Sequence, residues 1–150
     1  VGSEMCIRDR VVTYDDAVAD VVLPTPYDSW RVAQFGAEAG NPVVAGELAD
    51  PDRDGVANLL EYAFASDPRV AGGAAVTAGE VEEGLLAVDY RINLDATDVV
   101  AAVQWSADLG TWSDAPATVT VLGESGRVRT VRATVPADGV RRFLRVKVSR

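Results

Sequence analysis

The chain has no histidine and only one cysteine, and these scarcities remove many of the side chains that bind transition metals or catalyse reactions. Histidine is the commonest general base near neutral pH and the commonest nitrogen ligand for zinc, copper and iron. Cys6 has no second cysteine with which to form an internal disulfide. A metal ion bound by this chain is therefore expected to be held by oxygen atoms.

Positive charge and long apolar segments are also scarce. Fourteen Lys and Arg stand against 23 Asp and Glu, which gives a net charge of −9 at pH 7. Such a charge disfavours binding to the phosphate backbone of nucleic acids. No stretch approaches the roughly 18 consecutive apolar residues that span a membrane. We therefore expect neither a nucleic-acid partner nor a membrane span.

The pattern of residues divides the chain into four segments. Residues 1–10, "VGSEMCIRDR", resemble a translated adapter sequence that recurs at the ends of metagenomic reading frames, so we expect them to be non-native. Residues 11–26 end in "PTP" and are predicted to be a linker, because proline disfavours regular structure. Residues 27–70 have helical spacing, whereas residues 75–150 alternate as strands do. Most of the acidic excess lies in the first half of the chain.

The helical segment is predicted to contain two short helices. The first is expected over about residues 29–35, with Asp28 or Ser29 as its N-cap. The second is expected within "ANLLEYAFASDP" and is predicted to stop at Asp67-Pro68. Helices this short are unstable alone in water, so they are expected to pack on each other. The side chains expected at that contact are Trp30, Phe35, Leu60 and Phe64.

The second segment alternates apolar and polar residues. In "LLAVDYRINL" the apolar side chains from Leu86 to Leu94 share one face, as in a half-buried strand. Further strands are expected over residues 99–105, 118–121, 126–135 and 144–148. Five or six strands with short turns favour an antiparallel β-sandwich. The expected fold class is α+β, mainly β, with a short helix, loop and helix module followed by this sandwich.

The stretch "DPDRDGVANLLEY", residues 50–62, has the spacing of a calcium-binding loop. Gly55 at loop position 6 permits a sharp turn, Val56 offers its backbone carbonyl, and Glu61 can supply two oxygens from a helix. Together the ligands number about seven oxygens, as Ca²⁺ prefers, whereas Mg²⁺ demands tighter octahedral geometry. The candidate ligands at loop positions 1, 3, 5, 7, 9 and 12 are Asp50, Asp52, Asp54, Val56, Asn58 and Glu61.

An acidic turn can also cap a helix without any metal, and Asp54 or Asn58 could serve in that way. A cap needs one such residue, however, and here six positions fall in register, which favours calcium. Four carboxylates around one point repel each other without a cation, and Arg53 relieves only part of that repulsion. We therefore expect the ion to complete the fold of the loop.

Several segments together resemble the C-terminal region found on many large exported and surface proteins of bacteria. The loop itself is similar to thrombospondin type 3 repeats, dockerin loops and single EF-hands. Arg53 stands where such loops often have glycine, and one loop leaves no partner for EF-hand or dockerin pairing. The resemblance implies export, an extracellular or cell-surface location, and upstream domains of the same parent protein. The segments that carry it are "DPDRDGVANLLEYAFASDP", "YDSWRVAQF", "VQWSADLGTWS" and "RRFLRVKVS".

Aromatic and basic residues are further candidates for a functional site. Trp105 and Trp112 with Tyr90 could stack on a sugar, but Trp105 alternates with Val103 as a core residue does. The basic end "RRFLRVKVSR" could contact an acidic partner, but its charges alternate as on a solvated strand. Both observations favour structural roles, and a cell-surface glycan stays an alternative partner.

Catalysis is not expected from these residues. Asp89 or Asp108 with Glu124 could form a carboxylate pair, but nothing in the sequence fixes their separation. Ser106 and Ser113 have no histidine to activate them. The leading hypothesis is a non-catalytic calcium module that stiffens the junction to the β-sandwich. The alternatives are a carbohydrate-binding sandwich and a C-terminal sorting or anchoring domain.

Overall fold

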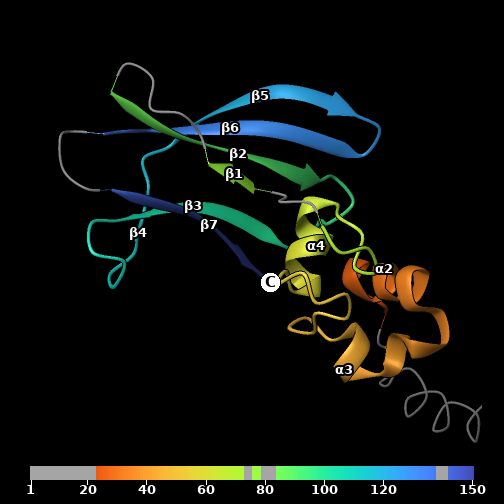
Figure 1. Ribbon diagram of the computed structural model, residues 1–150. Coiled ribbons are helices and arrows are strands. Elements are labelled where there is room, and N and C mark those ends of the chain that lie inside the picture. Colours follow the sequence, from red (N-terminus) through yellow and green to blue (C-terminus); the bar gives the residue numbers. More distant parts are fainter. Residues whose placement is uncertain (1–22, 73–75, 79–83, 138–141) are drawn as a thin grey trace, which may run out of the picture.

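A computed structural model describes residues 23–72, 76–78, 84–137 and 142–150 (Figure 1). A helical region comes first, and antiparallel sheets follow it, so the expected mainly β, α+β architecture is confirmed at this level. Residues 1–10 and most of the expected linker, 11–22, lie outside the described residues. None of the described helices is both long enough and apolar enough to cross a membrane.

Helix α2, Pro26–Phe35, begins three residues earlier than expected. Thr25 is its N-cap: the Asp28 N–H donates to Thr25 Oγ1 at 3.1 Å, and the Thr25 N–H donates to Asp28 Oδ2 at 3.0 Å. Pro26 occupies the first helical position, where its missing N–H costs nothing. One of the two prolines that predict a linker, Pro26, is therefore the first residue of the helix.

Two short helical turns follow α2 that the sequence did not indicate: η1, Gly36–Gly40, and α3, Pro42–Ala45. Asn41 caps α3 by accepting the Val43 N–H at 3.1 Å. Helix α4, Asn58–Phe64, comes after the acidic loop. Its C-cap is Ala65, whose φ of 55° is left-handed. The helix therefore stops before the expected Asp67-Pro68.

The described strands form two antiparallel sheets, one with the order β1-β2-β6-β5 and one with the order β4-β3-β7. Expected strands over 86–94, 99–105, 126–135 and 144–148 correspond to β2, β3, β6 and β7 to within a few residues at each end. The bounds are β1 Val76–Ala78, β2 Leu85–Asn93, β3 Val100–Ser106, β4 Ser113–Asp114, β5 Thr118–Ser125, β6 Val128–Pro136 and β7 Phe143–Ser149.

One apolar cluster joins residues of both sheets and of α4. Val88 and Tyr90 on β2, together with Val131 on β6, contribute buried side chains from the four-stranded sheet. Val103 on β3 contributes one from the three-stranded sheet, and Phe64 contributes one from α4. Burial of this apolar surface is the main force that holds the helical region against the strands.

Helix α4 has two packed sides, and this corrects the expected packing of the two helices. Leu60 packs against the sheet cluster and Phe64 is buried within it, so neither forms the contact with α2. The contact is made instead by Tyr62, whose ring lies 5.3 Å from Trp30 and 5.2 Å from Tyr27 between centroids. Helical spacing located the apolar side chains, but it could not assign each side to a partner.

Strand β5 lies at the edge of its sheet, and its valine side chains are more exposed than the sequence predicts. In the expected strand over residues 118–121, Val119 and Val121 alternate with threonines, which predicts that the valines share a half-buried face, yet they are 52% and 55% exposed. Strand β6 lies on one side of β5, and no described strand pairs with the other side. Alternation marked the strand correctly but carried no information about its place in the sheet.

A polar junction joins the helical region to the sheets around Asp98, in the connection between β2 and β3. Tyr62 donates its hydroxyl to Asp98 Oδ1 at 2.6 Å, and the Tyr27 N–H donates to Asp98 Oδ2 at 3.2 Å. Arg150, which follows β7, lies 3.2 Å from Asp98 Oδ2 and 5.0 Å from the Tyr27 ring centroid. Three distant parts of the chain therefore meet at one carboxylate.

Candidate metal centre

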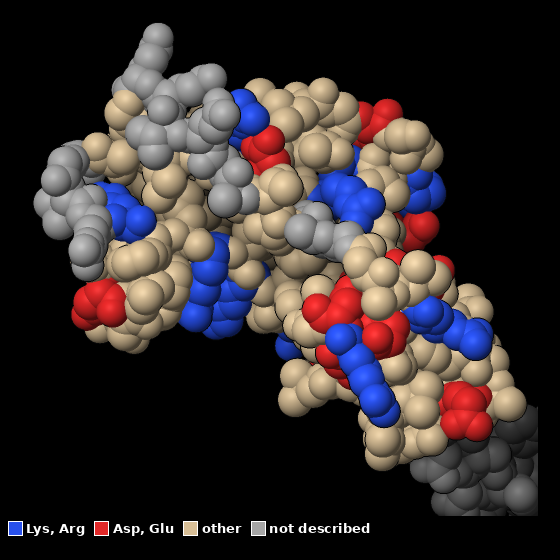
Figure 2. Space-filling model, in the orientation of Figure 1, with Lys and Arg blue, Asp and Glu red and all other residues tan. Residues whose placement is uncertain are grey.

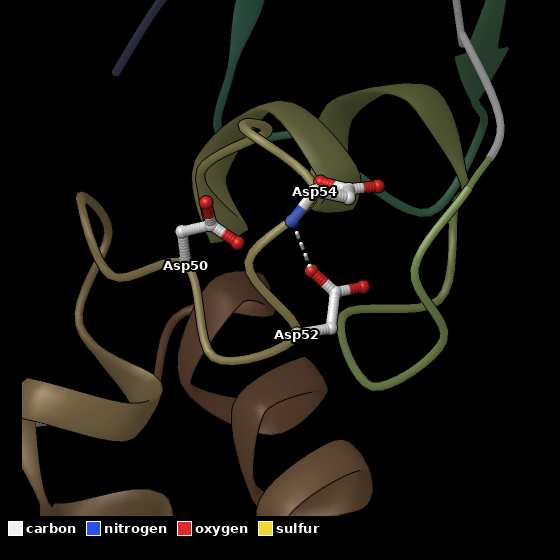
Figure 3. Close-up of side chains that lie close together, drawn as sticks. All are labelled: Asp50, Asp52 and Asp54. Carbon is white, nitrogen blue, oxygen red and sulfur yellow. Dashed lines mark hydrogen bonds between the residues drawn. The ribbon is translucent and has the colours of Figure 1, made fainter.

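The acidic loop between α3 and α4 is folded by its own aspartates (Figure 3). The Asp54 N–H donates to Asp52 Oδ1 at 3.2 Å, and the Gly55 N–H donates to Asp50 Oδ2 at 3.0 Å. The Val56 N–H donates to Asp54 Oδ1 at 2.8 Å. These bonds turn the chain tightly and fix the direction of each aspartate side chain.

Two residues of the loop have left-handed backbone. Gly55 has a φ of 91°, a value that glycine adopts without steric cost, as its loop position requires. Arg53 has a φ of 63°, which is uncommon for a residue with a side chain, and it is exposed. The position where similar loops often carry glycine is therefore one where glycine would relieve backbone strain.

The turns bring three of the predicted ligands together. One carboxylate oxygen from each of Asp50, Asp52 and Asp54 lies within 4.8 Å of the others. Figure 3 shows all three side chains around the same turn of chain, next to the start of α4. Figure 2 shows acidic side chains gathered over this region. Carboxylates at this spacing can share one cation.

Asn58 and Glu61 approach from the first turn of α4 and are 0% and 1% exposed. Asn58 Nδ2 donates to the carbonyl oxygens of Val44 at 2.8 Å and Gly46 at 2.9 Å. These two bonds use both Nδ2 hydrogens and so fix which way the amide faces. The carbonyl groups of Val44 and Gly46 are supporting groups that the loop spacing alone did not indicate.

Four buried oxygens of this region have no hydrogen-bond partner. All four belong to predicted ligands, and when the carboxyl groups are ionised they can only accept, so a hydrogen-bond donor or a cation is then what they lack. A buried acceptor without a partner costs about 1–3 kcal/mol, so four in one place need an explanation. A cation bound by this loop is one partner that such oxygens can take. The atoms are Asp50 Oδ1, Asp52 Oδ2, Asn58 Oδ1 and Glu61 Oε2.

The electrostatics agree with this donor set. Burial, and then the negative charges of Asp52, Asp54 and Asp50, raise the pKa of Glu61 from 4.5 to about 7. Burial is also the largest cause that raises the pKa of Asp52. Without a cation, these carboxyl groups resist ionisation in the folded chain. A divalent ion would reverse that preference, because it stabilises their charged forms.

Val56, the predicted ligand at loop position 7, lies between Gly55 and α4 and is half-buried. Its N–H is committed to Asp54, and its carbonyl is the atom predicted to bind the ion. The structure thus gathers three aspartates as one group, and Glu61 is not part of it. Asn58 and Glu61 are buried in the first turn of α4, and each has an oxygen without a partner.

Comparisons with known proteins do not identify this centre. The chain matches no protein-family model, and no curated protein matches it. The case for a metal ion therefore rests on the contacts of the loop itself.

The other candidate residues have structural partners. Arg132 binds Asp89 through two bonds of 2.7 and 2.8 Å, and Arg129 binds Glu124 at 2.8 Å. Asp108 Oδ1 accepts three hydrogen bonds within its own turn, from Ser106 Oγ and from two backbone N–H groups. These carboxylates are held in ion pairs or within a turn.

The aromatic candidates are also held in place. Tyr90 is 5% exposed in the core, so it is not available to a sugar. The Arg142 guanidinium lies 4.4 Å from the Trp105 ring centroid, and that of Arg145 lies 4.1 Å from the Trp112 ring centroid. Each tryptophan therefore stacks with a cation of its own chain.

Gly46 offers a test of the support beneath Asn58. A Cβ atom at Gly46 would lie 2.3 Å from the Pro42 carbonyl oxygen, so the backbone would have to move. We expect Gly46→Ala to lower the free energy of unfolding by about 2 kcal/mol and to weaken calcium binding. Urea unfolding and calcium titration measure both effects. Gly40→Ala, where the added atom meets nothing within 4 Å, should change neither.

The raised pKa of Glu61 predicts how pH acts on the calcium-free protein. The folded chain holds the proton more tightly than the unfolded chain does. The resulting stability is complete below about pH 4.5 and is lost as pH rises through about 7. Urea unfolding without calcium should therefore show falling stability between these values. A stability that rises over this interval would contradict the assignment.

Calcium binding should show the opposite dependence, since the ion requires ionised Glu61. With one competing proton of pKa about 7, the apparent affinity should be about tenfold weaker at pH 6 than at pH 8. Titration at the two pH values measures the ratio.

Proposed function

We propose that this chain is a non-catalytic calcium-binding module and that one Ca²⁺ is held by the loop from Asp50 to Glu61. The observation that carries the proposal is the set of four buried oxygens without partners, all on predicted ligands. Asp54 and the Val56 carbonyl complete the donor set. The role is structural: the ion neutralises the acidic loop and fixes it to the start of α4.

Calcium is favoured over other ions by the chemistry of the donors. All six ligand positions supply oxygen, which suits hard cations and disfavours zinc and copper. A bidentate glutamate at the last position gives about seven oxygens, as Ca²⁺ accepts, whereas Mg²⁺ keeps a smaller octahedral shell with several waters. We expect affinity in the ~10⁻⁴ to 10⁻³ M range of extracellular modules.

A structural role follows from where α4 lies. The helix has only seven residues, and its N-cap, Ala57, makes no side-chain cap hydrogen bond. It therefore depends on contacts outside itself. Asn58 and Glu61 would bind the ion on one side, while Phe64 and Tyr62 pack against the sheets and α2 on the others. The ion would thus stiffen the junction between the helical region and the strands.

We assign the two sheets to a β-sandwich, supported by the apolar cluster that they share. The resemblance to C-terminal regions of exported bacterial proteins supports placement of the module on a larger extracellular or cell-surface protein. There it would connect upstream domains to the sandwich. Calcium is abundant outside cells, so a site of modest affinity would stay loaded.

Thermal unfolding tests this proposal directly. With millimolar calcium the melting temperature should rise by several degrees over the value in a calcium chelator, because the ion binds the folded chain only. Magnesium at the same concentration should give a much smaller rise. Asp50→Asn should lose most of the calcium effect. Equal melting temperatures with and without calcium would refute the proposal.

A carbohydrate-binding role is the second candidate, and one observation favours it. A groove of about 370 Å³ lies among β2, β7 and the turn after β3, and Trp112 and Arg142 line it beside apolar side chains. An aromatic ring beside a polar group is a common arrangement for a sugar ring. Glycan retention that Trp112→Ala abolishes and Glu61→Gln preserves would support this role. An array on which no glycan is retained would remove it.

A further inference from the structure

Strand β5 has an open, apolar edge. All eight of its residues, Thr118–Ser125, are exposed, including three large apolar side chains, Val119, Val121 and Leu122. Figure 1 shows β5 at the top of the molecule, beside β6 and away from the helices. Figure 2 shows that edge as mostly uncharged side chains. Unpaired strand edges of this kind readily accept another strand.

The other edge strands of the described residues are protected. Strand β1 has three residues and β4 has two, which gives little backbone to pair with. Strand β7 carries Arg145 and Lys147, and charged side chains on an edge discourage pairing. Strand β5 has no lysine, arginine or proline, and its one charged residue, Glu124, is bound by Arg129. Among the described edges, β5 is therefore the one suited to pairing.

We propose that β5 is a dimer interface at which a second copy of this chain pairs antiparallel with it through a two-fold axis at Thr120. In this register Val119 of each copy lies opposite Val121 of the other copy. Both valines pair with buried residues of β6, Val119 with Ala133 and Val121 with Val131, so they share the core-facing side. Dimerisation would thus extend the apolar layer across both copies.

A second copy is favoured over an unrelated strand because the segment is complementary to itself. "TVTVL", residues 118–122, has four β-branched residues followed by Leu122. In this register the two valines pair with each other, Thr120 pairs with its own copy, and Thr118 lies opposite Leu122. No charged residue lies within this segment, so the two-fold axis brings no like charges together. The irregular register between Val121 and Gly123 marks where regular pairing would end.

The interface is small, and each copy has a net charge of −9, so the dimer should be weak. We expect a dissociation constant on the order of 10–100 µM, which should fall as added salt screens the repulsion between copies. Sedimentation equilibrium of the full chain measures this, with Cys6→Ser in every sample to exclude disulfide dimers. All samples contain calcium. The dimer should form both in the chain with Glu61 and in the Glu61→Gln variant.

The matched variants are Val121→Lys on β5 and Val100→Lys on β3. Val100 is 65% exposed and lies on another strand, so its substitution has the same chemistry away from the interface. Val121→Lys should weaken the dimer at least about tenfold, because two lysines would enter an apolar pairing. Val100→Lys should leave the dissociation constant unchanged. Circular dichroism checks that both variants are folded.

Cysteine cross-linking tests the register itself. In the proposed dimer two Thr120 side chains lie opposite each other with Cβ atoms about 5 Å apart, so Thr120→Cys should be oxidised to a linked dimer. Two Thr118 side chains lie about 13 Å apart, and Thr118→Cys should not be linked. A chain that stays monomeric at every concentration, a dimer unaffected by Val121→Lys, or cross-linking at Thr118 in place of Thr120 would overturn the proposal.

Discussion

Glu61→Gln is expected to stabilise the calcium-free protein and to abolish its stabilisation by calcium. Glu61 is 1% exposed, and burial, followed by the negative charges of three aspartates, raises the pKa of its carboxyl group to about 7. At pH 8 and without an ion the folded chain must hold this group ionised, at a cost that glutamine removes. We expect a gain on the order of 1–3 kcal/mol in the free energy of unfolding.

With calcium the advantage of Glu61→Gln should disappear. A calcium concentration about 100 times the dissociation constant stabilises the unmutated protein by about 2.7 kcal/mol, and Glu61→Gln should lose nearly all of this. Glutamine keeps the shape of the side chain, so the loss reports on charge and coordination. Urea unfolding at pH 8, with calcium and with a chelator, gives both values. Calcium stabilisation that survives in this variant would contradict the assignment of Glu61.

The matched control is Glu38→Gln. Glu38 is exposed on η1 and accepts a hydrogen bond from Asn41 Nδ2, a role that glutamine can keep. The same chemical change should therefore alter neither the calcium-free stability nor the calcium effect by more than about 0.5 kcal/mol.

Asp98→Ala is expected to give the largest loss of stability outside the metal centre, about 3 kcal/mol. The substitution removes the acceptor for the Tyr62 hydroxyl and the Tyr27 N–H and leaves Arg150 without this partner. Tyr62 is 1% exposed and its hydroxyl would be left buried without a bond. Urea unfolding measures the loss.

Asp95→Ala is the matched control for this prediction. Asp95 lies in the same connection and pairs with Arg127, but the two side chains are 61% and 65% exposed. An exposed ion pair is worth little, so we expect a change of at most about 1 kcal/mol. Hydrogen exchange adds a second readout: in Asp98→Ala the amides of α2 should lose protection before those of β2 and β6. Equal losses in the two variants would show that the Asp98 junction does not hold the helical region to the sheets.

The sequence predicted the order of the architecture because the two periodicities are local signals. Alternation in "LLAVDYRINL" predicted β2, and the same signal located β3, β6 and β7. The sequence does not reveal the capping box of Thr25 and Asp28, because prolines on both sides of Thr25 indicate a break in regular structure, whereas Pro26 fits the first turn of the helix. Single-turn elements such as α3 are too short to show any period.

The contacts between elements were harder to predict than the elements. Leu60 and Phe64 were assigned to the wrong partner, because an amphipathic helix shows which side is apolar and not what covers it. The exposure of Val119 and Val121 depends on β5 being an edge strand, which alternation cannot reveal. Strand position is a property of the whole sheet.

The candidate metal centre was more accessible to sequence reasoning, because its ligands lie within 12 residues and their spacing carries the geometry. The structure brings Asp50, Asp52 and Asp54 together and buries Asn58 and Glu61 in the first turn of α4. The carbonyl groups of Val44 and Gly46, which orient Asn58, could not be predicted because they come from α3 and the residue after it. The identity of the ion stays a prediction.

Isothermal titration of the full chain with calcium tests the central claim most directly. We expect saturable binding of one ion per chain with a dissociation constant in the ~10⁻⁴ to 10⁻³ M range, and no saturable binding in Glu61→Gln. Magnesium should bind much more weakly. Absence of calcium binding to the unmutated chain, or binding that Glu61→Gln leaves intact, would contradict the account.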